Sequence, residues 1–543
     1  MMTTLKKSLS LPALCWEARY RDTLAIALLW TLAVIGALSR PLMPIDETRY
    51  VSVAWEMWHA HSWVLPLMNG EPYSDKPPLL FWLIQAGWGV FGVNAWWPKL
   101  IAPLAALVAM QHLYRIARRL GYAGSRARVA PMVLMAMLMW NLYSGALMFD
   151  ILLTACLLGA ISPLVSGALT PRRALQCGVW LGLALLAKGP AVFVTFGPIL
   201  LGLRWWRAEP LGAGGRRRLL LALALGIAIL AAWALSAAVI GGHAYARELL
   251  WGQSVDRLHD SMAHARPLWW YLPWLPVLLF PWSLWPAAWP RRPRQRHQRL
   301  MWIWVLVPFV LFSLISGKQI HYLMPLLPAL ALMVMDRLAQ PEDERPRRVR
   351  AVAAAIIALG ALGLVLALFG HGVLDATTLS LFGSLALIAW GAIVWRWQPA
   401  KRSIAARGLA LGSGVALLIL AQLMLAPLWQ RYDVTRPGEL IAQLQLDAKP
   451  VAFDGNYQAT FQFAGRLEQP LATLGSPQDA CALHQAHPDA WIVGRERDWQ
   501  RYIADASAVH TFDYRGGKLY ILPTRALFHA GQSALCGDTT PAP

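Results

Sequence analysis

Charged residues are scarce in this chain of 543 residues, of which 14% are Asp, Glu, Lys or Arg and 57% are hydrophobic. A soluble domain is typically about one quarter charged, so the composition excludes a single water-soluble globule. Acidic residues are the rarer kind: 29 stand against 49 Lys and Arg, a formal net charge of +20. The basic residues form short clusters between apolar runs, as in multi-span membrane proteins. We therefore expect a lipid bilayer around the chain and no nucleic-acid partner.

The chain also lacks two kinds of motif, cysteine pairs for metal or redox chemistry and glycine-rich loops for nucleotide binding. No Cys-x-x-Cys pair occurs, so a cysteine-based zinc or redox site is not indicated; the five cysteines are Cys15, Cys156, Cys177, Cys481 and Cys536. The chain also has no P-loop and no Gly-x-Gly-x-x-Gly run that opens a helix, which are the common phosphate-binding motifs for nucleotides.

Long apolar runs are what the chain does have. A bilayer core of about 30 Å needs about 20 mainly apolar helical residues. We predict a mainly α, polytopic membrane domain over residues 1–427 with about 13 spans on this criterion, and a shorter interfacial segment at 79–92. The first run has no small-residue cleavage site and is interpreted as an uncleaved anchor. The predicted spans lie near 23–39, 99–114, 129–144, 147–165, 174–187, 189–204, 219–240, 268–289, 300–316, 321–336, 351–369, 378–395 and 406–427.

The basic clusters orient the predicted bundle. When spans are counted from Lys6 and Lys7, every cluster falls on one side, which the positive-inside rule makes cytoplasmic. An odd number of spans then puts the C-terminus on the other side. We expect a bacterial inner-membrane protein with a cytoplasmic N-terminus, periplasmic loops 40–98 and 241–267, and a periplasmic tail 428–543. The clusters occupy 115–128, 204–218, 291–299, 337–350 and 396–407.

The tail 428–543 has a different composition. Short strand-like runs at 451–453, 491–493 and 519–522 alternate with helix-like ones, which predicts a small α/β domain. Cys481 and Cys536 both fall in this tail. In an oxidising compartment they form a disulfide or remain free thiols, and the sequence leaves both alternatives open.

Residues suited to chemistry begin directly after the first predicted span, where residues 46–50 are Asp-Glu-Thr-Arg-Tyr. Helical spacing would put Asp46, Arg49 and Tyr50 on one face. Asp46 has a structural alternative, because Asp is favoured as the N-cap of a helix, here one running to about His61. Capping and catalysis can coexist.

Lys76 stands before two consecutive prolines, which hold it on a stiff turn. A lone lysine at a membrane surface is usually an interfacial anchor. Lys76, however, adjoins Asp75 and Tyr73 in a loop with few other cations, so we interpret it as functional.

Asp150 lies near the outer end of the predicted span 147–165. An ionisable side chain at membrane depth costs about 2.5–3.5 kcal/mol on insertion scales and is a functional candidate by default. Its structural alternative is an ion pair with a lysine of another span, either Lys188 or Lys318. Loop 241–267 adds further polar groups, among them Arg257 and two histidines.

A divalent metal such as zinc is one interpretation of these loops, since histidine and carboxylate are zinc ligands. The residues that would meet across the two outer loops are Asp75, His259 and His264. No spacing demands a metal, and the absence of any required cofactor is the alternative.

All of these groups gather near the predicted periplasmic surface. ATP and nucleotide sugars are absent there, so the energy for a synthesis must arrive with the substrate. A sugar joined to a polyprenyl phosphate is such a substrate.

The motif order resembles the GT-C membrane glycosyltransferases, which use polyprenyl-phosphate sugars and include the protein O-mannosyltransferases. Within that group it resembles the lipid A aminoarabinose transferases, over roughly residues 20–340. There are two departures: Asp75 stands where a longer acid is expected, and segment 318–322 lacks a second lysine. The combination that carries the likeness is Asp46, Glu47, Thr48, Arg49, Tyr50, Tyr73, Lys76, Arg257, His264, Lys318 and Tyr322.

The resemblance implies an inverting transfer of 4-amino-4-deoxy-L-arabinose from undecaprenyl phosphate to a lipid A phosphate, a lipopolysaccharide modification that gives resistance to polymyxin and other cationic peptides. We expect a monomer. The implied catalytic residues are Asp46, Lys76 and Asp150. The implied substrate-binding residues are Glu47, Arg49, Tyr50, Tyr73, Lys188, Arg257, Lys318 and Tyr322.

Two other functions remain open. A protein O-mannosyltransferase-like enzyme would share the fold and donor class but use a Ser or Thr acceptor. A multi-span lipid or solute transporter should show an internal repeat and charges near the bilayer midplane, whereas here the polar residues concentrate at one surface. A membrane scaffold would not explain Asp150.

Overall fold

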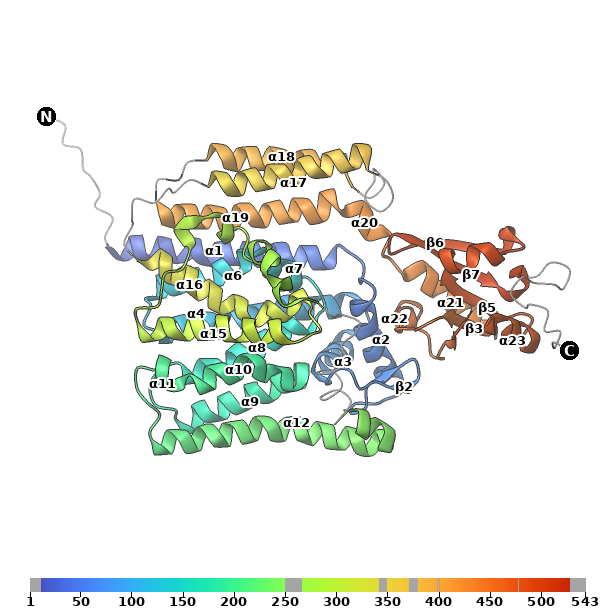
Figure 1. Ribbon diagram of the computed structural model, residues 1–543, viewed down its shortest axis with the longest axis horizontal. Coiled ribbons are helices and arrows are strands. Elements are labelled where there is room, and N and C mark those ends of the chain that lie inside the picture. Colours follow the sequence, from blue (N-terminus) through green and yellow to red (C-terminus); the bar gives the residue numbers. More distant parts are fainter. Residues whose placement is uncertain are drawn as a thin grey trace.

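The computed structural model describes residues 11–249, 266–340, 349–370, 379–397, 399, 401–476 and 478–527. Long helices run side by side along the long axis of the molecule, and a smaller unit of strands and short helices lies beyond one end of them (Figure 1). Helices α2 (Asp46–His59) and α3 (Leu79–Phe91) lie between the two parts. We call this end of the bundle the site end.

The chain is a multi-pass membrane protein. Within the described residues, eight helical stretches are long and apolar enough to cross a bilayer, or nine if the bent pair Leu138–Ser144 and Phe149–Leu164 counts as one span. The predicted number of about thirteen spans stays a prediction. The longer helices are α1 (Leu11–Leu38), α4 (Trp96–Arg119), α9 (Pro171–Lys188), α12 (Ala213–Arg247), α15 (Arg296–Leu314), α16 (Leu327–Ala339), α17 (Arg350–Phe369), α18 (Leu381–Arg396) and α19 (Arg402–Ile419).

Shorter helices complete the bundle. The predicted span 129–144 is divided into α6 (Val129–Ala136) and α7 (Leu138–Ser144) by Met137, whose backbone is extended. After α7 the chain turns sharply into α8 (Phe149–Ile161). Gly189 separates α9 from α10 (Val192–Leu201).

The structure differs from the sequence prediction over residues 268–289. In place of one spanning helix, this segment is a series of short pieces: η5 (Leu268–Trp274), α14 (Leu275–Leu278), η6 (Trp282–Leu284) and η7 (Pro286–Ala288). Each proline lacks a backbone N–H and clashes with the preceding helical turn. The prediction of a regular span is therefore wrong, because hydropathy alone does not register prolines 273, 276, 281 and 286.

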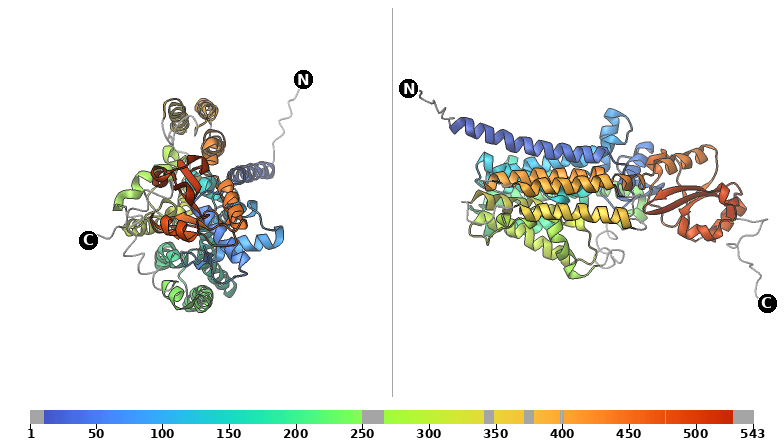
Figure 2. Two further views of the ribbon diagram at one scale, coloured as in Figure 1. Left: turned by 90° about the vertical axis from the view of Figure 1, so that its right-hand side faces the viewer. Right: turned by 90° about the horizontal axis from the view of Figure 1, so that it is seen from above.

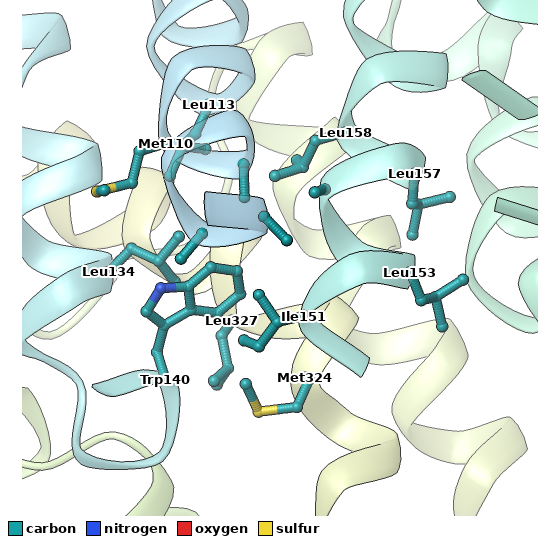
Figure 3. Packing of buried hydrophobic residues seen from close by; sticks show 14 of the residues in the cluster. Met110, Leu113, Leu134, Trp140, Ile151, Leu153, Leu157, Leu158, Met324 and Leu327 are labelled. Atoms are coloured by element: carbon teal, nitrogen blue, oxygen red, sulfur yellow. The ribbon is translucent and has the colours of Figure 1, made fainter. Parts of the chain in front are cut away.

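Helix α8 lies at the centre of the bundle. All of its residues are buried, and its main neighbours are α9, α4 and the short helix η8 (Ile320–Leu326). Figure 3 shows Trp140 of α7 packed among Leu134, Ile151 and Leu327. Packing by van der Waals contact is the main stabilising term between helices in a membrane. The packing around α8 therefore fixes the position of this helix and of Asp150 in its first turn.

The C-terminal unit comprises residues 435–527 and follows α20 (Ala426–Gln430), which contains the predicted domain boundary at residue 427. Its five strands lie in the order β4-β3-β5-β7-β6. Strand β3 is parallel to β4 and β5, whereas β7 is antiparallel to β5 and β6. The strands are β3 (Val451–Asp454), β4 (Ala472–Leu474), β5 (Trp491–Arg495), β6 (His510–Tyr514) and β7 (Gly517–Pro523).

Four helices connect and cover these strands, and apolar clusters form on both faces of the sheet. Cys481 is disulfide-bonded. Cys536, the other cysteine of the tail, for which the sequence leaves a disulfide and a free thiol open, lies outside the described residues. The helices are α21 (Thr435–Leu446), α22 (Gln462–Gly465), α23 (Asp479–Ala486) and α24 (Glu496–Trp499).

The C-terminal unit is docked on α2 and α3, and it lies beyond the site end of the bundle in Figure 1 and in the right-hand view of Figure 2. The indole of Trp55 donates to the carbonyl oxygen of Leu467 at 2.9 Å. The rings of Trp88 and Phe463 are stacked with their centroids 5.4 Å apart. Two parts distant in sequence therefore share a packed interface.

Candidate functional site

Helix α2 carries the first group of predicted residues. Asp46 is the first residue of this helix; its N-cap is Ile45, with no side-chain cap hydrogen bond. The alternative in which Asp46 caps the helix is therefore wrong. Its carboxylate instead accepts hydrogen bonds from Arg49 at 2.6 Å and from the hydroxyl of Tyr50 at 3.3 Å. The predicted shared face of Asp46, Arg49 and Tyr50 is confirmed.

Burial and neighbouring charges shift the pKa values of Tyr50 and Arg49. Burial and the neighbouring Asp46 raise the pKa of Tyr50 well above its ordinary value, so its hydroxyl remains a donor at neutral pH. Burial works against the charge of Arg49, but Tyr73, Tyr50 and Asp46 leave its pKa raised. Its Nε is buried and has no hydrogen-bond partner within the described residues. Arg49 is thus a cation that is held by two side chains and whose Nε–H has no partner within the described residues.

Glu47 holds the start of α2 in place. Its carboxylate accepts hydrogen bonds from both terminal nitrogens of Arg40, at 2.6 and 2.7 Å. It also accepts from the backbone N–H groups of Met43 and Leu147, each at 2.9 Å. Glu47 therefore ties the end of α1, the start of α2 and the segment before α8 together. Its role in substrate binding stays a prediction.

Asp150 lies in the first turn of α8, where it is 2% exposed. The ammonium of Lys188, the last residue of α9, is 2.5 Å from its carboxylate and 4.8 Å from the centre of the Tyr322 ring. The predicted ion pair with a lysine of another span is therefore present. Lys318 is placed elsewhere: its ammonium donates to the carbonyl oxygens of Arg266 and Ile315, at 2.9 and 2.5 Å.

The two aspartates and Lys76 meet in one electrostatic neighbourhood. The charge of Lys76 acts on Asp150 and on His321. The charges of Asp46 and Asp150 both act on Tyr143. We call Asp46, Lys76, Asp150 and Lys188 the acid–lysine cluster. It brings together α2, the loop before α3, α8 and α9 at the site end.

A cavity of about 350 Å³ lies beside Asp46. Most of its lining is apolar and comes from α1, the segment 141–148 and α19 with the residues that follow it. The polar side chains in the lining are Arg40, Asp46, Glu47, Asn141, Tyr143 and Gln422. An apolar space next to charged groups suits an amphiphilic ligand.

Known proteins resemble this chain in sequence and in fold. A family model described as dolichyl-phosphate-mannose-protein mannosyltransferase matches residues 75–235. The undecaprenyl phosphate-alpha-4-amino-4-deoxy-L-arabinose arabinosyl transferase of Pseudomonas paraeruginosa is 32% identical over 343 residues, which cover 57% of this chain and 60% of that protein. The protein of the same name from Pseudomonas savastanoi is 26% identical over 502 residues, which cover 88% and 92% of the two chains. The chain is therefore similar in sequence to proteins named as aminoarabinose transferases.

The fold agrees with this relationship. ArnT from Cupriavidus metallidurans, crystallised with undecaprenyl phosphate bound, superposes with a TM-score of 0.72 at 20% identity and covers 93% of this chain and 98% of its own. The predicted resemblance to the GT-C glycosyltransferases, and within them to the aminoarabinose transferases, is confirmed. The chain spans 60% of the length of the first relative.

Some residues that the aminoarabinose-transferase likeness suggested occupy a loop near the cluster. Tyr73 is buried, and its carbonyl oxygen accepts from the hydroxyl of Tyr245 at 3.5 Å. The hydroxyl of Ser74 donates to Glu248 at 3.0 Å. The loop that carries Asp75 and Lys76 is thus attached to the last turn of α12 and the residues after it.

Three other predictions cannot be placed, because Arg257, His259 and His264 lie outside the described residues. Among the residues that the structure does describe, no group of three or more His, Cys, Asp or Glu is arranged to hold a metal ion. Zinc binding by Asp75, His259 and His264 stays a prediction.

Three residues of the site, His321, Tyr143 and Arg40, were not predicted from the sequence. His321 packs edge-on against Tyr322, and its ring centre is 6.0 Å from that of Tyr143. The position of His321 beside Tyr322 was an available signal. Tyr143 lies within an apolar run, and Arg40 ends the first span, so neither differs locally from an interfacial anchor.

Proposed function

We propose that this chain is a glycosyltransferase that moves 4-amino-4-deoxy-L-arabinose from undecaprenyl phosphate to a phosphate of lipid A. The observation that carries the proposal is the acid–lysine cluster at one end of a membrane-embedded bundle. The names of the relatives and the undecaprenyl phosphate bound to ArnT support the donor. In this proposal the chain lies in the bacterial inner membrane with its N-terminus cytoplasmic and its site periplasmic.

The donor phosphate is the leaving group, so negative charge grows on it as the sugar departs. Lys76 and the Nε of Arg49 bind this phosphate in the proposal, because charge-assisted hydrogen bonds stabilise phosphate oxygens. Arg49 is suited to the task since its Nε is buried and lacks a partner within the described residues. The acceptor attacks the sugar from the opposite side, which inverts its configuration.

The two aspartates have different roles in this reaction. Asp150 is 2% exposed and paired with Lys188, so it holds that cation and the outer end of α9 in place. The side chain of Asp46 is 47% exposed and borders the cavity. A lipid A phosphate has a second pKa near 6 and is already largely anionic at pH 7, so it needs little base catalysis. Asp46 therefore orients the acceptor or the ammonium group of the sugar.

The test is direct transfer by the purified protein. Undecaprenyl-phosphate aminoarabinose and lipid A are incubated with it, and mass spectrometry detects the added pentosamine. We expect transfer by the wild type and none by Asp46→Ala or Lys76→Ala, with normal expression of both. Lys449→Ala, on the C-terminal unit, is the control and should retain activity. Near-normal transfer by either site variant would contradict the assignment.

A protein O-mannosyltransferase-like activity is the second candidate, because the matching family model over residues 75–235 carries that description. A Ser or Thr hydroxyl is neutral and requires a base, which Asp46 would supply. The same assay with a polyprenyl-phosphate mannose donor and a Ser/Thr-rich peptide distinguishes the two. Modified peptide with unmodified lipid A would favour this candidate.

A further inference from the structure

Arg49 is held at both ends of its guanidinium group, and the two holds come from different parts of the chain. Its Nη2 donates to Asp46 at 2.6 Å, within α2. Its Nη1 donates to the amide oxygen of Gln458 at 2.7 Å. Gln458 belongs to the C-terminal unit and is 409 residues away in sequence. A planar fork bound on two sides has one orientation.

The loop between β3 and α22 is built to hold Gln458 still. The amide nitrogen of Gln458 donates to the side-chain oxygen of Asn456 at 2.7 Å, which turns its oxygen toward Arg49. The next residue, Ala459, has φ +50°, a left-handed conformation that L-residues avoid unless their surroundings enforce it. The hydroxyl of Tyr457 accepts from the N–H of Phe461 at 3.0 Å and donates to Gln462. The loop therefore has little freedom.

The loop is also fixed relative to Arg49. The N–H of Phe463 donates to the hydroxyl of Ser52 at 3.0 Å, one helical turn beyond Arg49 on α2. Trp55, one turn further along, donates to Leu467. The guanidinium of Arg466 lies 3.6 Å from the centre of the Phe463 ring. These contacts hold the Gln458 loop at a constant distance from the helix that carries Arg49.

The chemistry of the acceptor atom matters as much as its position. A carboxylate at position 458 would fix Arg49 but would also cancel part of the positive charge that a phosphate requires. The neutral amide oxygen of Gln458 fixes the side chain without adding a second negative charge to that of Asp46, which already contacts Arg49. The third donor of Arg49, its Nε, stays buried without a partner in the described part of the chain.

We propose that Gln458 is a positioning residue, through which the C-terminal unit orients Arg49 for binding the phosphate of the lipid-linked donor. The inference rests on the proposed function for the identity of that donor. The C-terminal unit then completes the site, and its docking on α2 is part of forming the binding site.

The experiment compares Gln458→Met, which has a similar shape but no acceptor oxygen, with Gln458→Glu, which keeps an acceptor and adds a charge. For Gln458→Met we expect kcat/KM to fall about tenfold to a hundredfold, as for a small misplacement of a binding group. For Gln458→Glu we expect kcat close to wild type and a raised KM for the donor. Gln445→Met, a matched change elsewhere in the C-terminal unit, should leave both constants unchanged.

A double-mutant cycle separates positioning from simple stabilisation of the interface. If Gln458 acts through Arg49, Gln458→Met should have no further effect on an Arg49→Lys protein. Equal losses in the wild-type and Arg49→Lys backgrounds would overturn the inference. Ser52→Ala tests docking alone: if it reproduces the kinetic constants of Gln458→Met, docking rather than Arg49 orientation is responsible and the inference fails.

The affinity of the full-length protein for undecaprenyl phosphate is measured for the same four proteins of the cycle. This binding measurement does not depend on sugar transfer. Binding weakened by Gln458→Met in the wild-type background alone supports the inference even if no sugar is transferred to lipid A. Transfer by the wild type with unchanged undecaprenyl phosphate binding and kinetics in Gln458→Met would contradict the inference while leaving the proposed function in place.

Discussion

A carboxylate that is 2% exposed among packed helices requires a cation, and Lys188 provides it at 2.5 Å from Asp150. Removing one partner leaves the other as an uncompensated buried charge, whereas removing both is much less costly. We expect Asp150→Asn and Lys188→Met each to lower the free energy of unfolding by about 3–5 kcal/mol. The double variant should lose less than either single one.

Denaturant unfolding of the detergent-solubilised variants measures this difference. A double variant whose loss equals the sum of the two single losses would show that the pair is not energetically coupled. Transfer activity should be lost in all three proteins, since Lys188 and Asp150 place the ends of α9 and α8 beside Lys76.

The raised pKa of Tyr50 predicts how the free energy of unfolding depends on pH. Its pKa is raised well above the ordinary value in the folded protein, so its proton is held more tightly in the folded state than in the unfolded one. Its contribution to stability is therefore fully present below about pH 10, the pKa of an unfolded tyrosine. As pH rises above that value, the unfolded state ionises first and the contribution is lost.

The measurement compares wild type with Tyr50→Phe, which cannot ionise. The difference between their free energies of unfolding should be constant from about pH 7 to pH 9.5. Above about pH 10 the wild type should lose stability relative to Tyr50→Phe. A difference that already changes near pH 8 would mean that the pKa of Tyr50 is lowered instead.

At the scale of elements, the turn between α9 and α10 decides where Lys188 points. Gly189 has φ 64° and ψ −153°, a backbone region that is essentially restricted to glycine. Gly189→Ala should cost about 1–3 kcal/mol of stability, displace Lys188 from Asp150 and reduce transfer. Gly197→Ala in α10 is the matched control, because its added methyl group would meet no atom within 4 Å.

Thermal unfolding and transfer assays of the two alanine variants test this prediction. A Gly189→Ala protein with wild-type activity would show that the turn tolerates another conformation. Loss of activity in Gly197→Ala as well would point to a general weakness of the α9–α10 pair rather than to the placement of Lys188.

At the scale of the whole molecule, docking of the C-terminal unit depends on Asn69. Its amide donates to the carbonyl oxygen of Leu471 and accepts from the N–H of Leu471 and from Gln462, at 2.9, 2.8 and 3.0 Å. Asn69 has φ +54°, so Asn69→Gly removes the amide without straining the backbone. We expect the docking to weaken by about 1–3 kcal/mol, since a hydrogen bond contributes about 1 kcal/mol.

Hydrogen exchange followed by mass spectrometry reports this change. Exchange should become faster in residues 462–471 and in α2, while β6, at the far edge of the sheet, serves as an internal reference. Faster exchange across all five strands would instead indicate unfolding of the whole unit.

Much of this architecture follows from one-dimensional properties of the chain. Apolar runs locate α1, α4, α12, α15, α17 and α19, because crossing a bilayer depends on length and hydropathy alone. The clustering of Asp46, Arg49 and Tyr50 follows from helical spacing, since all three lie within one turn. Asp150 was identifiable because a carboxylate at membrane depth is costly wherever it occurs.

Only the tertiary structure decided which partners these groups have. It pairs Asp150 with Lys188, not Lys318, commits Glu47 to Arg40, and brings Gln458 to Arg49 from the other end of the chain. It also breaks the apolar segment 268–289 at its prolines. The physical reason is the same in each case: a hydrogen bond or ion pair forms only within a few ångströms, and packing of distant segments sets those distances.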